Sequence, residues 1–465
     1  MKTFVTGEWG RPHGLEQHVF RRHPNDTVVR FPNRDTYDIL KQRPRVATAH
    51  PFESISNPLQ YNWHVYYDQL KNQVRHHRPD LLVCCFIDDA TVGGMWEAFG
   101  DRIPTLCVNR EAARLENDRW YAREVTTACG VNASSMIKCA TREEALRRVL
   151  ESDWSGFVIK IPDAGSSIPG VVTEVYGTKE ETLAALHARD EQLFPIVIEE
   201  KLLGYEIAFS CLVDYRNEMF FPMVTDFEYT KLATGDLGVE TSEMGAHDLA
   251  GVGKKPQEEI FRPLMKWFKE VKYLGWFDAS CMFNPVTGSL TVFEFMTRLG
   301  SSQFELAMTM MASDFVDVAR QLWTGGLSQG DIDWRYKHGI GVTVVDASAM
   351  TMEKTRPTRI VGPIRELMIG RHEEVGSYDA LQVLSRMDAQ VNDDGLLMTR
   401  GDRVFMAMGL SDSFGLARDC AYNVARMCRF PGNMYRTDIG HRWDDIHVKE
   451  AMAEHQVLPT KWWIE

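Results

Sequence analysis

Phe157–Lys160 reads FVIK, Ile196–Glu200 reads IVIEE and Leu290–Arg298 reads LTVFEFMTR. Each stretch is an apolar run of strand length that ends in charged side chains. In order along the chain they supply a lysine, a pair of carboxylates, and an acid followed by an arginine. This order predicts two sheets that hold a charged ligand between them.

Lys160 ends the first strand, and a loop of small residues, Ile161–Val172, follows it. A triphosphate needs cations and backbone N–H groups aimed at it from a loop that can approach closely. We therefore expect the Lys160 ammonium to lie near the phosphates of ATP. The alternative is an ordinary surface lysine at the end of a strand.

The acidic end of the second strand predicts a nucleoside site. We expect Glu199 or Glu200 to accept hydrogen bonds from an adenine amine or from ribose hydroxyls, and Glu206, after the turn at Gly204, to reach the same sugar. Leu202 lies in that turn and is assigned to the same cofactor-binding set. The alternative is a solvated acidic strand end.

The third stretch alternates with period two, which predicts that Val292, Glu294, Met296 and Arg298 share one face. A buried acid and arginine cost desolvation unless each has a partner. Mg²⁺ on Glu294 and a phosphate on Arg298 would satisfy both. A plain ion pair between Glu294 and Arg298 is the competing explanation.

This ordered set resembles the ATP-grasp superfamily, and within it the phosphoribosylamine–glycine ligases, almost end to end. The similar stretches are VTGEWGRPHGL (Val5–Leu15), RFPN (Arg30–Asn33), the strand that precedes Asp88, RLENDRWYARE (Arg114–Glu124), GDLGVETSEMGA (Gly235–Ala246) and YRTDIGHR (Tyr435–Arg442). The resemblance implies an α/β protein with the ATP-grasp fold, an N-terminal doubly wound parallel sheet and a small C-terminal α/β cap.

The resemblance also implies roles for individual residues. Arg119 stands where the family has a phosphate-binding lysine, so the catalytic set is Arg298, Lys160 and Arg119, and Arg119 joins the cofactor-binding residues. The expected substrate-binding residues are Gly10, Arg11, His13, Asn33, Asp88, Glu228 and Lys231. The implied cofactors are ATP and Mg²⁺ or Mn²⁺.

Three departures from the family pattern bear on the chemistry. Met296 stands where the family has a metal-binding asparagine, and a thioether is a poor ligand for a hard cation. Asp278, on the neighbouring strand, is the expected replacement ligand together with Glu294, and Ser280 is the alternative. The phosphate loop has serines and Pro169 in place of the family's glycine–lysine–glycine core, and GSSQ (300–303) lacks the family's acids.

Bulk properties favour a cytoplasmic enzyme. The chain has 465 residues, 44% of them hydrophobic, and a net charge of −13, which argues against a nucleic-acid groove. Nine cysteines without regular spacing predict no disulfide framework, and no apolar run is long enough for a spanning helix. The expected partners are small molecules, an amino acid and a phosphorylated amine, with no nucleic acid or membrane, in a monomer or homodimer.

Four segments are expected: 1–110 as a Rossmann-like substrate domain, 111–325 as the ATP-grasp domain, 326–442 as a C-terminal α/β domain and 443–465 as a tail. Thr141–Asp153 carries a capping-box start and helical spacing, and 255–275 is typical of an amphipathic helix before a strand. The segment from Thr230 to Ala246 is expected to close over the site as a lid.

The implied chemistry is activation of a carboxylate as an acyl phosphate, followed by attack of an amine. Three hypotheses compete. The first is the family's own ligase, which joins glycine to phosphoribosylamine. The second is a diverged ligase for another amine, such as a modified nucleotide, and the third is a nucleotide-binding protein without catalysis, for which Met296 is the main argument.

Overall fold

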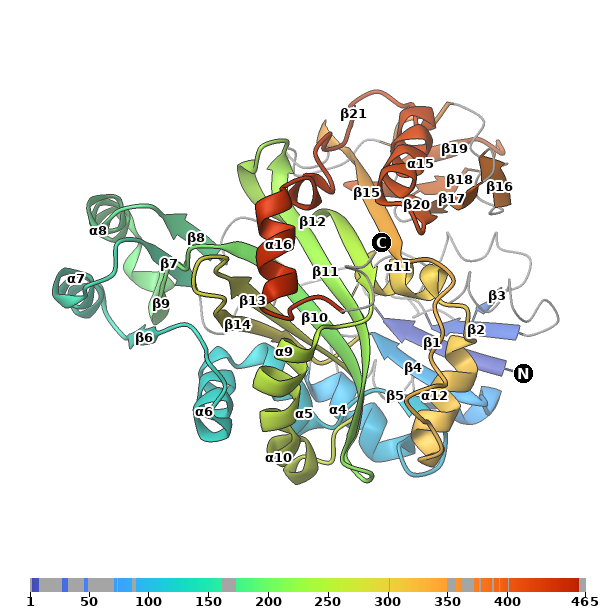
Figure 1. Ribbon diagram of the computed structural model, residues 1–465, viewed down its shortest axis with the longest axis horizontal. Helices are drawn as coiled ribbons and strands as arrows, with labels where there is room; N and C mark the ends of the chain where they lie inside the picture. The colour runs from blue at the N-terminus through green and yellow to red at the C-terminus, as the bar shows by residue number, and fades with distance from the viewer. Residues whose placement is uncertain are drawn as a thin grey trace.

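A computed structural model gives the fold, and it describes residues 2–7, 27–31, 46–48, 71–72, 74–85, 89–160, 173–300, 302–348, 357–361, 372–375, 378–386, 389–392, 394–399 and 401–459. Three sheets make up its framework: a parallel sheet near the N-terminus, a small four-stranded sheet that projects to one side, and a ten-stranded sheet between them (Figure 1). The expected α/β class is confirmed.

The N-terminal sheet is parallel in every pairing that the structure describes, with strand order β3-β2-β1-β4-β5. The strands are β1 (Lys2–Gly7), β2 (Thr27–Phe31), β3 (Val46–Thr48), β4 (Leu81–Cys85) and β5 (Thr105–Leu106). Helices α4 (Asp89–Phe99) and α5 (Arg110–Asn117) follow β4 and β5. This sheet corresponds to the predicted doubly wound region.

The small sheet has the order β6-β9-β7-β8 and carries two of the three stretches that opened the sequence analysis. Its strands are β6 (Met136–Cys139), β7 (Phe157–Lys160), β8 (Thr173–Tyr176) and β9 (Ile196–Glu200). Helices α7 (Arg142–Glu151) and α8 (Lys179–Ala188) and the short helix η2 (Glu191–Leu193) complete this unit. The Thr141 hydroxyl accepts from the Glu144 N–H at 3.2 Å, so the predicted helix start is confirmed.

The ten-stranded sheet runs in the order β14-β13-β10-β11-β12-β15-β20-β17-β16, and β21 also pairs with β15. Its first five strands are β10 (Tyr205–Asp214), β11 (Met219–Ala233), β12 (Leu237–Ala250), β13 (Leu274–Phe283) and β14 (Leu290–Met296). The remaining strands are β15 (His338–Asp346), β16 (His372–Val375), β17 (Tyr378–Arg386), β20 (Arg403–Ser411) and β21 (Asn433–Met434). The β12–β15 ladder therefore crosses the boundary expected at 325.

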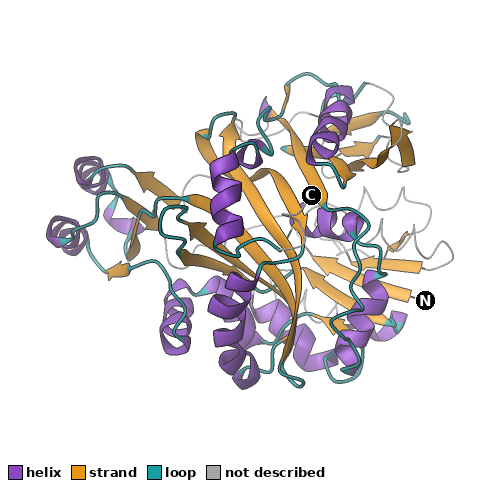
Figure 2. Ribbon diagram, viewed as in Figure 1, coloured by secondary structure: helices purple, strands orange, loops and turns teal. Residues whose placement is uncertain are grey.

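Helices pack on both sides of this sheet (Figure 2). The predicted amphipathic helix forms as the continuous turns α9 (Lys254–Pro256), η3 (Gln257–Phe261) and α10 (Arg262–Glu270). The other helices are α6 (Arg119–Cys129), α11 (Ser302–Met310), α12 (Phe315–Thr324), α15 (Phe414–Met427), η4 (His441–Trp443) and α16 (Ile446–Glu454). A separate pair of strands is β18 (Ala389–Val391) with β19 (Leu397–Thr399).

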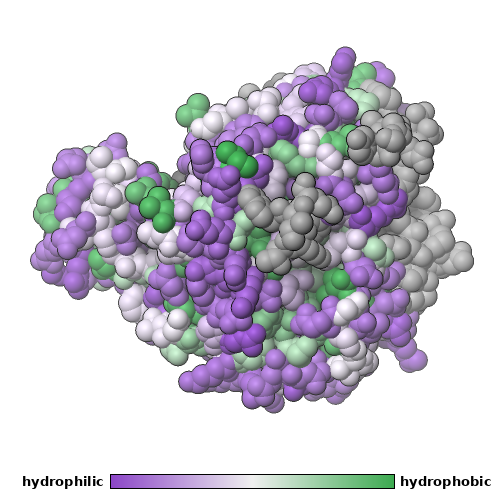
Figure 3. Space-filling view, in the orientation of Figure 1, coloured by the Kyte–Doolittle hydropathy of each residue, from purple (hydrophilic) through white to green (hydrophobic). Residues whose placement is uncertain are grey.

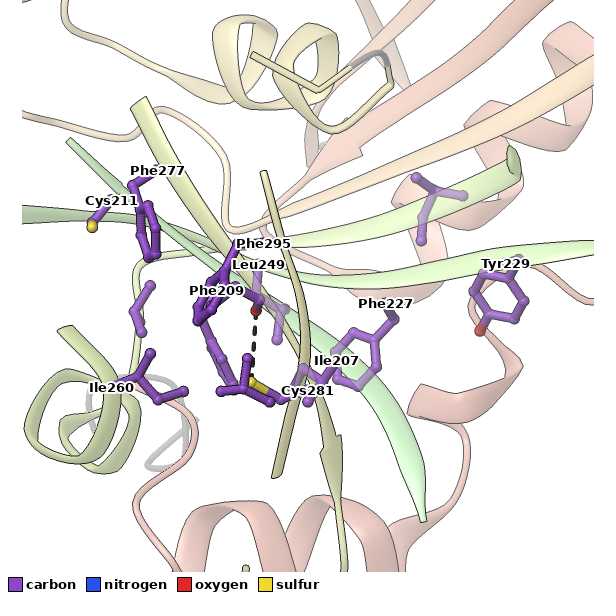
Figure 4. Packing of buried hydrophobic residues seen from close by; sticks show 14 of the residues in the cluster. Ile207, Phe209, Cys211, Phe227, Tyr229, Leu249, Ile260, Phe277, Cys281 and Phe295 are labelled. Carbon is purple, nitrogen blue, oxygen red and sulfur yellow. Dashed lines mark hydrogen bonds between the residues drawn. The ribbon is translucent and has the colours of Figure 1, made fainter. Parts of the chain in front are cut away.

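The main core lies on the odd-numbered faces of β10 and β13. Phe209, Phe277 and Cys281 are completely buried and point toward Phe295 and Leu249, with the Cys281 thiol directed at the Ala279 carbonyl at 3.7 Å (Figure 4). The even-numbered positions of the same strands point to the opposite face. Burial of the odd face therefore decides which side chains are presented to a ligand.

The surface in the view of Figure 3 is mainly hydrophilic, with hydrophobic residues in small separate spots. Within the described ranges, no helix is both long enough and apolar enough to cross a bilayer.

Candidate functional site

Lys160 is buried rather than exposed, which excludes the surface-lysine alternative. Its Nζ lies 3.0 Å from Oε2 of Glu199 on the paired strand β9, and the two side chains are 6% and 3% exposed. The Ser134 hydroxyl donates to the same Glu199 oxygen at 3.1 Å, and Arg123 Nη2 donates to that hydroxyl at 2.8 Å. Glu199 therefore holds the lysine, which leaves Glu200 and Glu206 better placed to meet a nucleoside.

Glu206 lies at the start of β10, opposite Met282 of β13. Burial raises the pKa of Glu206 to about 7, an effect that Arg442 partly opposes and that Glu240 and Glu294 increase. Glu200 ends β9, where its N–H donates to the Ser135 carbonyl at 3.2 Å, and Leu202 follows in the turn before β10. These residues border the junction of the two sheets, as the predicted nucleoside site requires.

Glu294 and Arg119 face each other across a cavity between β14 and α6. Arg119 Nη1 lies 3.8 Å from Glu294 Oε1, and the side chains are 17% and 43% exposed. The cavity is lined by Leu115, Glu116, Arg119, Ala122, Arg123, Thr126, Met136, Val292, Phe293, Glu294 and Phe295. Lys160 reaches the same region, since its Nζ lies 5.8 Å from the centre of the Phe293 ring. The structure thus brings three of the predicted charged residues together.

The strict alternation predicted for Leu290–Arg298 is wrong. Cys281 pairs with Val292 while Ser280 pairs with Glu294, so Phe293 is the extra residue of a β-bulge. Val292 is therefore buried in the core, whereas Glu294 points to the opposite face. The bulge directs the Glu294 carboxylate into the site.

Arg298 does not form the competing ion pair with Glu294. Its Nη2 lies 2.9 Å from Glu116 Oε1, with side chains 9% and 8% exposed, and its Nε donates to the same oxygen at 3.0 Å. The other Glu116 oxygen accepts from the Thr297 N–H at 3.0 Å. Arg298 therefore has a carboxylate partner already, and a phosphate would have to share it.

Asp278 is fully buried and lies directly opposite Met296, while Ser280 lies opposite Glu294. The two carboxylates and the Ser280 hydroxyl thus lie on one face of β13 and β14. They are hard oxygen donors of the kind that Mg²⁺ prefers, and ATP phosphates would add more. Within the described residues no three His, Cys, Asp or Glu side chains form a metal cluster on their own.

The segment from Thr230 to Ala246, expected to close as a lid, forms a hairpin in this structure. Most of it belongs to the paired strands β11 and β12, and its turn is held by the C-terminal segment. The fully buried Arg436 binds Asp236 and Asp438 at 2.7 Å, and the Gly235 N–H donates to Asp438 at 2.9 Å. These contacts hold the turn of the hairpin against the C-terminal segment, and closure as a lid stays a prediction.

The two predicted substrate residues on this hairpin lie on its strands. Lys231 is paired with Glu240 at 2.8 Å. Glu228 shares a face with Glu206, and burial, together with Glu243 and Glu206, raises its pKa. The hairpin therefore presents a protonatable acid, and a lysine that already has a partner.

One acidic pair was missed in the sequence. Asp226 and Asp248 occupy directly opposed positions of β11 and β12 and are 3% and 0% exposed. Burial raises the pKa of both. The charges of Asp248 and Glu243 add to the rise at Asp226, whereas the hydrogen bond with Asp226 opposes the rise at Asp248, to which Glu243 and Asp278 add. The pair is recognisable only once the hairpin register is known, because 22 residues of sequence separation carry no signal.

The predicted residues Gly10, Arg11, His13, Asn33 and Asp88, and the phosphate loop 161–172, lie outside the described residues. Their assignment stays a prediction. The described part of the site thus consists of the small sheet, β10–β14 and helix α6.

A family model described as "Phosphoribosylglycinamide synthetase, ATP-grasp (A) domain" matches residues 117–303. Phosphoribosylamine–glycine ligases are similar over much of the chain. That of Salmonella typhimurium is 28% identical, covering 95% of this chain and 98% of the relative, and that of Ralstonia nicotianae is 27% identical, covering 72% and 77%.

Solved structures agree on the fold. Phosphoribosylamine–glycine ligase from Thermotoga maritima has a TM-score of 0.70 at 23% identity, covering 95% of this chain and all of that one. The biotin carboxylase domain of 2-oxoglutarate carboxylase from Hydrogenobacter thermophilus, in complex with MgADP, has a TM-score of 0.65 at 12% identity, covering 98% and 97%. The chain therefore has the ATP-grasp fold and is similar over most of its length to phosphoribosylamine–glycine ligases.

Proposed function

We propose that this protein is an ATP-dependent carboxylate–amine ligase that joins glycine to phosphoribosylamine and releases ADP and phosphate. The observation that carries the proposal is that Arg119 and Glu294 line one cavity between a helix and the large sheet, with Lys160 of the small sheet 5.8 Å from the centre of the Phe293 ring in the cavity wall. The family match and the names of the relatives agree with this chemistry.

The reaction runs in two steps. The γ-phosphoryl group of ATP moves to a glycine carboxylate oxygen, which breaks the bond to the β-phosphate bridge and leaves ADP. The amine then attacks the acyl phosphate, loses a proton and expels inorganic phosphate as the amide forms. Such steps need positioning and charge neutralisation rather than a protein nucleophile.

The described residues divide these tasks between them. Lys160 and Arg119 neutralise the phosphates, with Lys160 held at a fixed position by Glu199. Glu200, Leu202 and Glu206 border the nucleoside, and Glu228 lies on the same sheet face as Glu206. Arg298 stabilises the transferring phosphate only if it shares its guanidinium between that group and Glu116.

Glu294, with Asp278 or Ser280, would hold Mg²⁺ or Mn²⁺. Such a cation would offset the negative charge of the phosphates. The Met296 thioether adds no ligand for such a cation, so Asp278, opposite it in the ladder, is the proposed substitute.

A second candidate is a ligase of the same type for a different amine. It is favoured by a group of acidic side chains on β10, β11 and β12 whose charges raise the pKa of neighbours in the group. These are Glu206, Glu228, Asp226, Asp248 and Glu243. A cationic amine would be attracted by these acids. The protein is further proposed to act in the cytoplasm on small molecules, as a monomer or homodimer.

Mg²⁺-dependent ADP release by the purified protein tests the proposal, with glycine alone, with phosphoribosylamine generated in the same tube, and with both. Release that needs both substrates supports it. ATP that raises the melting temperature without ADP release from this pair would contradict it and favour the second candidate or a purely binding role. A panel of amines would then separate those two.

A further inference from the structure

We propose that Arg123 is a positioning residue for the phosphate-binding lysine, acting on Lys160 through Ser134 and Glu199. This inference rests on the proposed function, because it assigns the lysine to phosphate. Arg123 itself touches neither the lysine nor the Glu294 carboxylate in any contact that the structure gives for it. Its effect has to pass through the two residues between them.

The chain of contacts is continuous. Arg123 Nη2 donates to Ser134 Oγ at 2.8 Å, Ser134 Oγ donates to Glu199 Oε2 at 3.1 Å, and Lys160 Nζ donates to that same oxygen at 3.0 Å. A hydroxyl has a single proton, and because Ser134 donates it to Glu199, only its lone pairs are left to meet Arg123. Arg123 supplies that donor and thereby fixes the rotation of the hydroxyl.

Ser134 is anchored on a different element from the residues it connects. Its backbone N–H donates to the Val292 carbonyl of β14 at 3.0 Å, and its side chain is buried. The relay therefore joins helix α6 and the edge of the ten-stranded sheet to β9 and β7 of the small sheet. These are the walls between which the nucleotide is proposed to lie.

Electrostatics agree with the geometry. Burial lowers the pKa of Arg123, and the charge of Glu199 opposes that shift. Glu199 thus lies between two cations, one in direct contact and one a hydroxyl away. Charge-assisted bonds of this kind are short and strongly oriented, so they limit the positions open to the lysine ammonium.

Loss of the guanidinium would free the Ser134 hydroxyl and leave Glu199 held by the lysine alone. The carboxylate would then turn, and the lysine would follow it away from the phosphate position. Binding of the adenosine part, which the relay does not touch, would be preserved. The relay therefore predicts a defect specific to phosphate.

Calorimetry of the full chain with Mg²⁺-ADP and with adenosine tests this in Arg123→Met, Arg123→Lys and Ser134→Ala. Glu124→Gln, on the same helix and exposed, is the control. We expect Arg123→Met and Ser134→Ala to weaken ADP binding about tenfold or more, which is about 1.4 kcal/mol, with adenosine affinity unchanged and Arg123→Lys in between. ADP affinity within twofold of the control, or equal losses for both ligands, would overturn the relay.

A double-mutant cycle decides the matter without nucleotide. Arg123 and Lys160 make no direct contact, so additive changes in melting temperature for Arg123→Met and Lys160→Met would mean that no relay exists. Non-additive changes support it. If the unmodified protein binds no ADP at all, the proposed function fails, and the cycle still tests the relay.

Discussion

Replacing Lys160 by methionine should destabilise the protein far more than an ordinary surface substitution. The Lys160 and Glu199 side chains are 6% and 3% exposed, so removal of the ammonium leaves a buried carboxylate with only the Ser134 hydroxyl as a hydrogen-bond partner on Oε2. Breaking a buried ion pair by removing one partner costs about 3–5 kcal/mol. The remaining bond to Ser134 places our expectation at the lower end, about 3 kcal/mol.

Removal of both charges should have a smaller effect. Glu199→Gln combined with Lys160→Met leaves neither member of the pair charged, and replacement of a whole buried pair is often neutral or stabilising by about 1–4 kcal/mol. We expect the double variant to recover at least half of the loss while binding ADP as poorly as Lys160→Met. The recovery would separate the stabilising role of the pair from its role at the phosphates.

Urea unfolding followed by fluorescence and circular dichroism measures both quantities, with Lys179→Met as the matched control. Lys179 donates only to backbone carbonyls, so no carboxylate loses its partner in that control. If Lys160→Met and Lys179→Met cost the same, or if the double variant is less stable than either single variant, the argument from the buried pair is refuted.

Three further predictions concern the same sheets. Asp226→Asn should raise the melting temperature at pH 8 more than at pH 4. Burial and the neighbouring acids raise the folded-state pKa of Asp226, so the folded protein binds this proton more tightly and stability is lost as pH rises through that pKa. Equal shifts in melting temperature at both pH values would contradict this prediction. Glu206→Gln should abolish the pH dependence of ADP affinity near neutrality. The pKa of Glu206 is raised to about 7, and its carboxylate accepts hydrogen bonds from hydroxyls best above that value. Calorimetry from pH 6 to 8 measures this, and an unchanged dependence of ADP affinity on pH would exclude Glu206 from the nucleoside site. Phe277→Ala should cost about 3–5 kcal/mol of unfolding free energy in urea titration, as the ring is fully buried against Phe268, Tyr273 and Phe295, whereas the exposed Val286→Ala should change little.

Local patterns predicted the elements of this fold well. The strands at Phe157–Lys160 and Ile196–Glu200 and the helix after Thr141 form where apolar runs and a capping residue indicated them. Each depends on neighbouring residues alone. The resemblance to known ATP-grasp ligases then ordered these elements in space.

The errors arose wherever a distant strand or helix decides the outcome. The bulge at Phe293 depends on the register with β13, and a period of two within one strand cannot reveal it. The partner of Arg298 is Glu116, 182 residues away. The turn that follows Thr230 is held by Arg436, 200 residues beyond Asp236, and no local pattern reveals that contact.

The ladder between β12 and β15 has a mechanical consequence. Strand pairing continues, with local bulges, from β14, which contains Glu294, to the C-terminal strands. These strands therefore resist bending and form one stiff plate. The small sheet is joined to that plate by two short chain segments, by the Ala133–Val292 bridge and by the Ser134 contact. Because so few contacts join the two, a change in the angle of the small sheet would break few hydrogen bonds, whereas a bend within the plate would break a whole strand ladder.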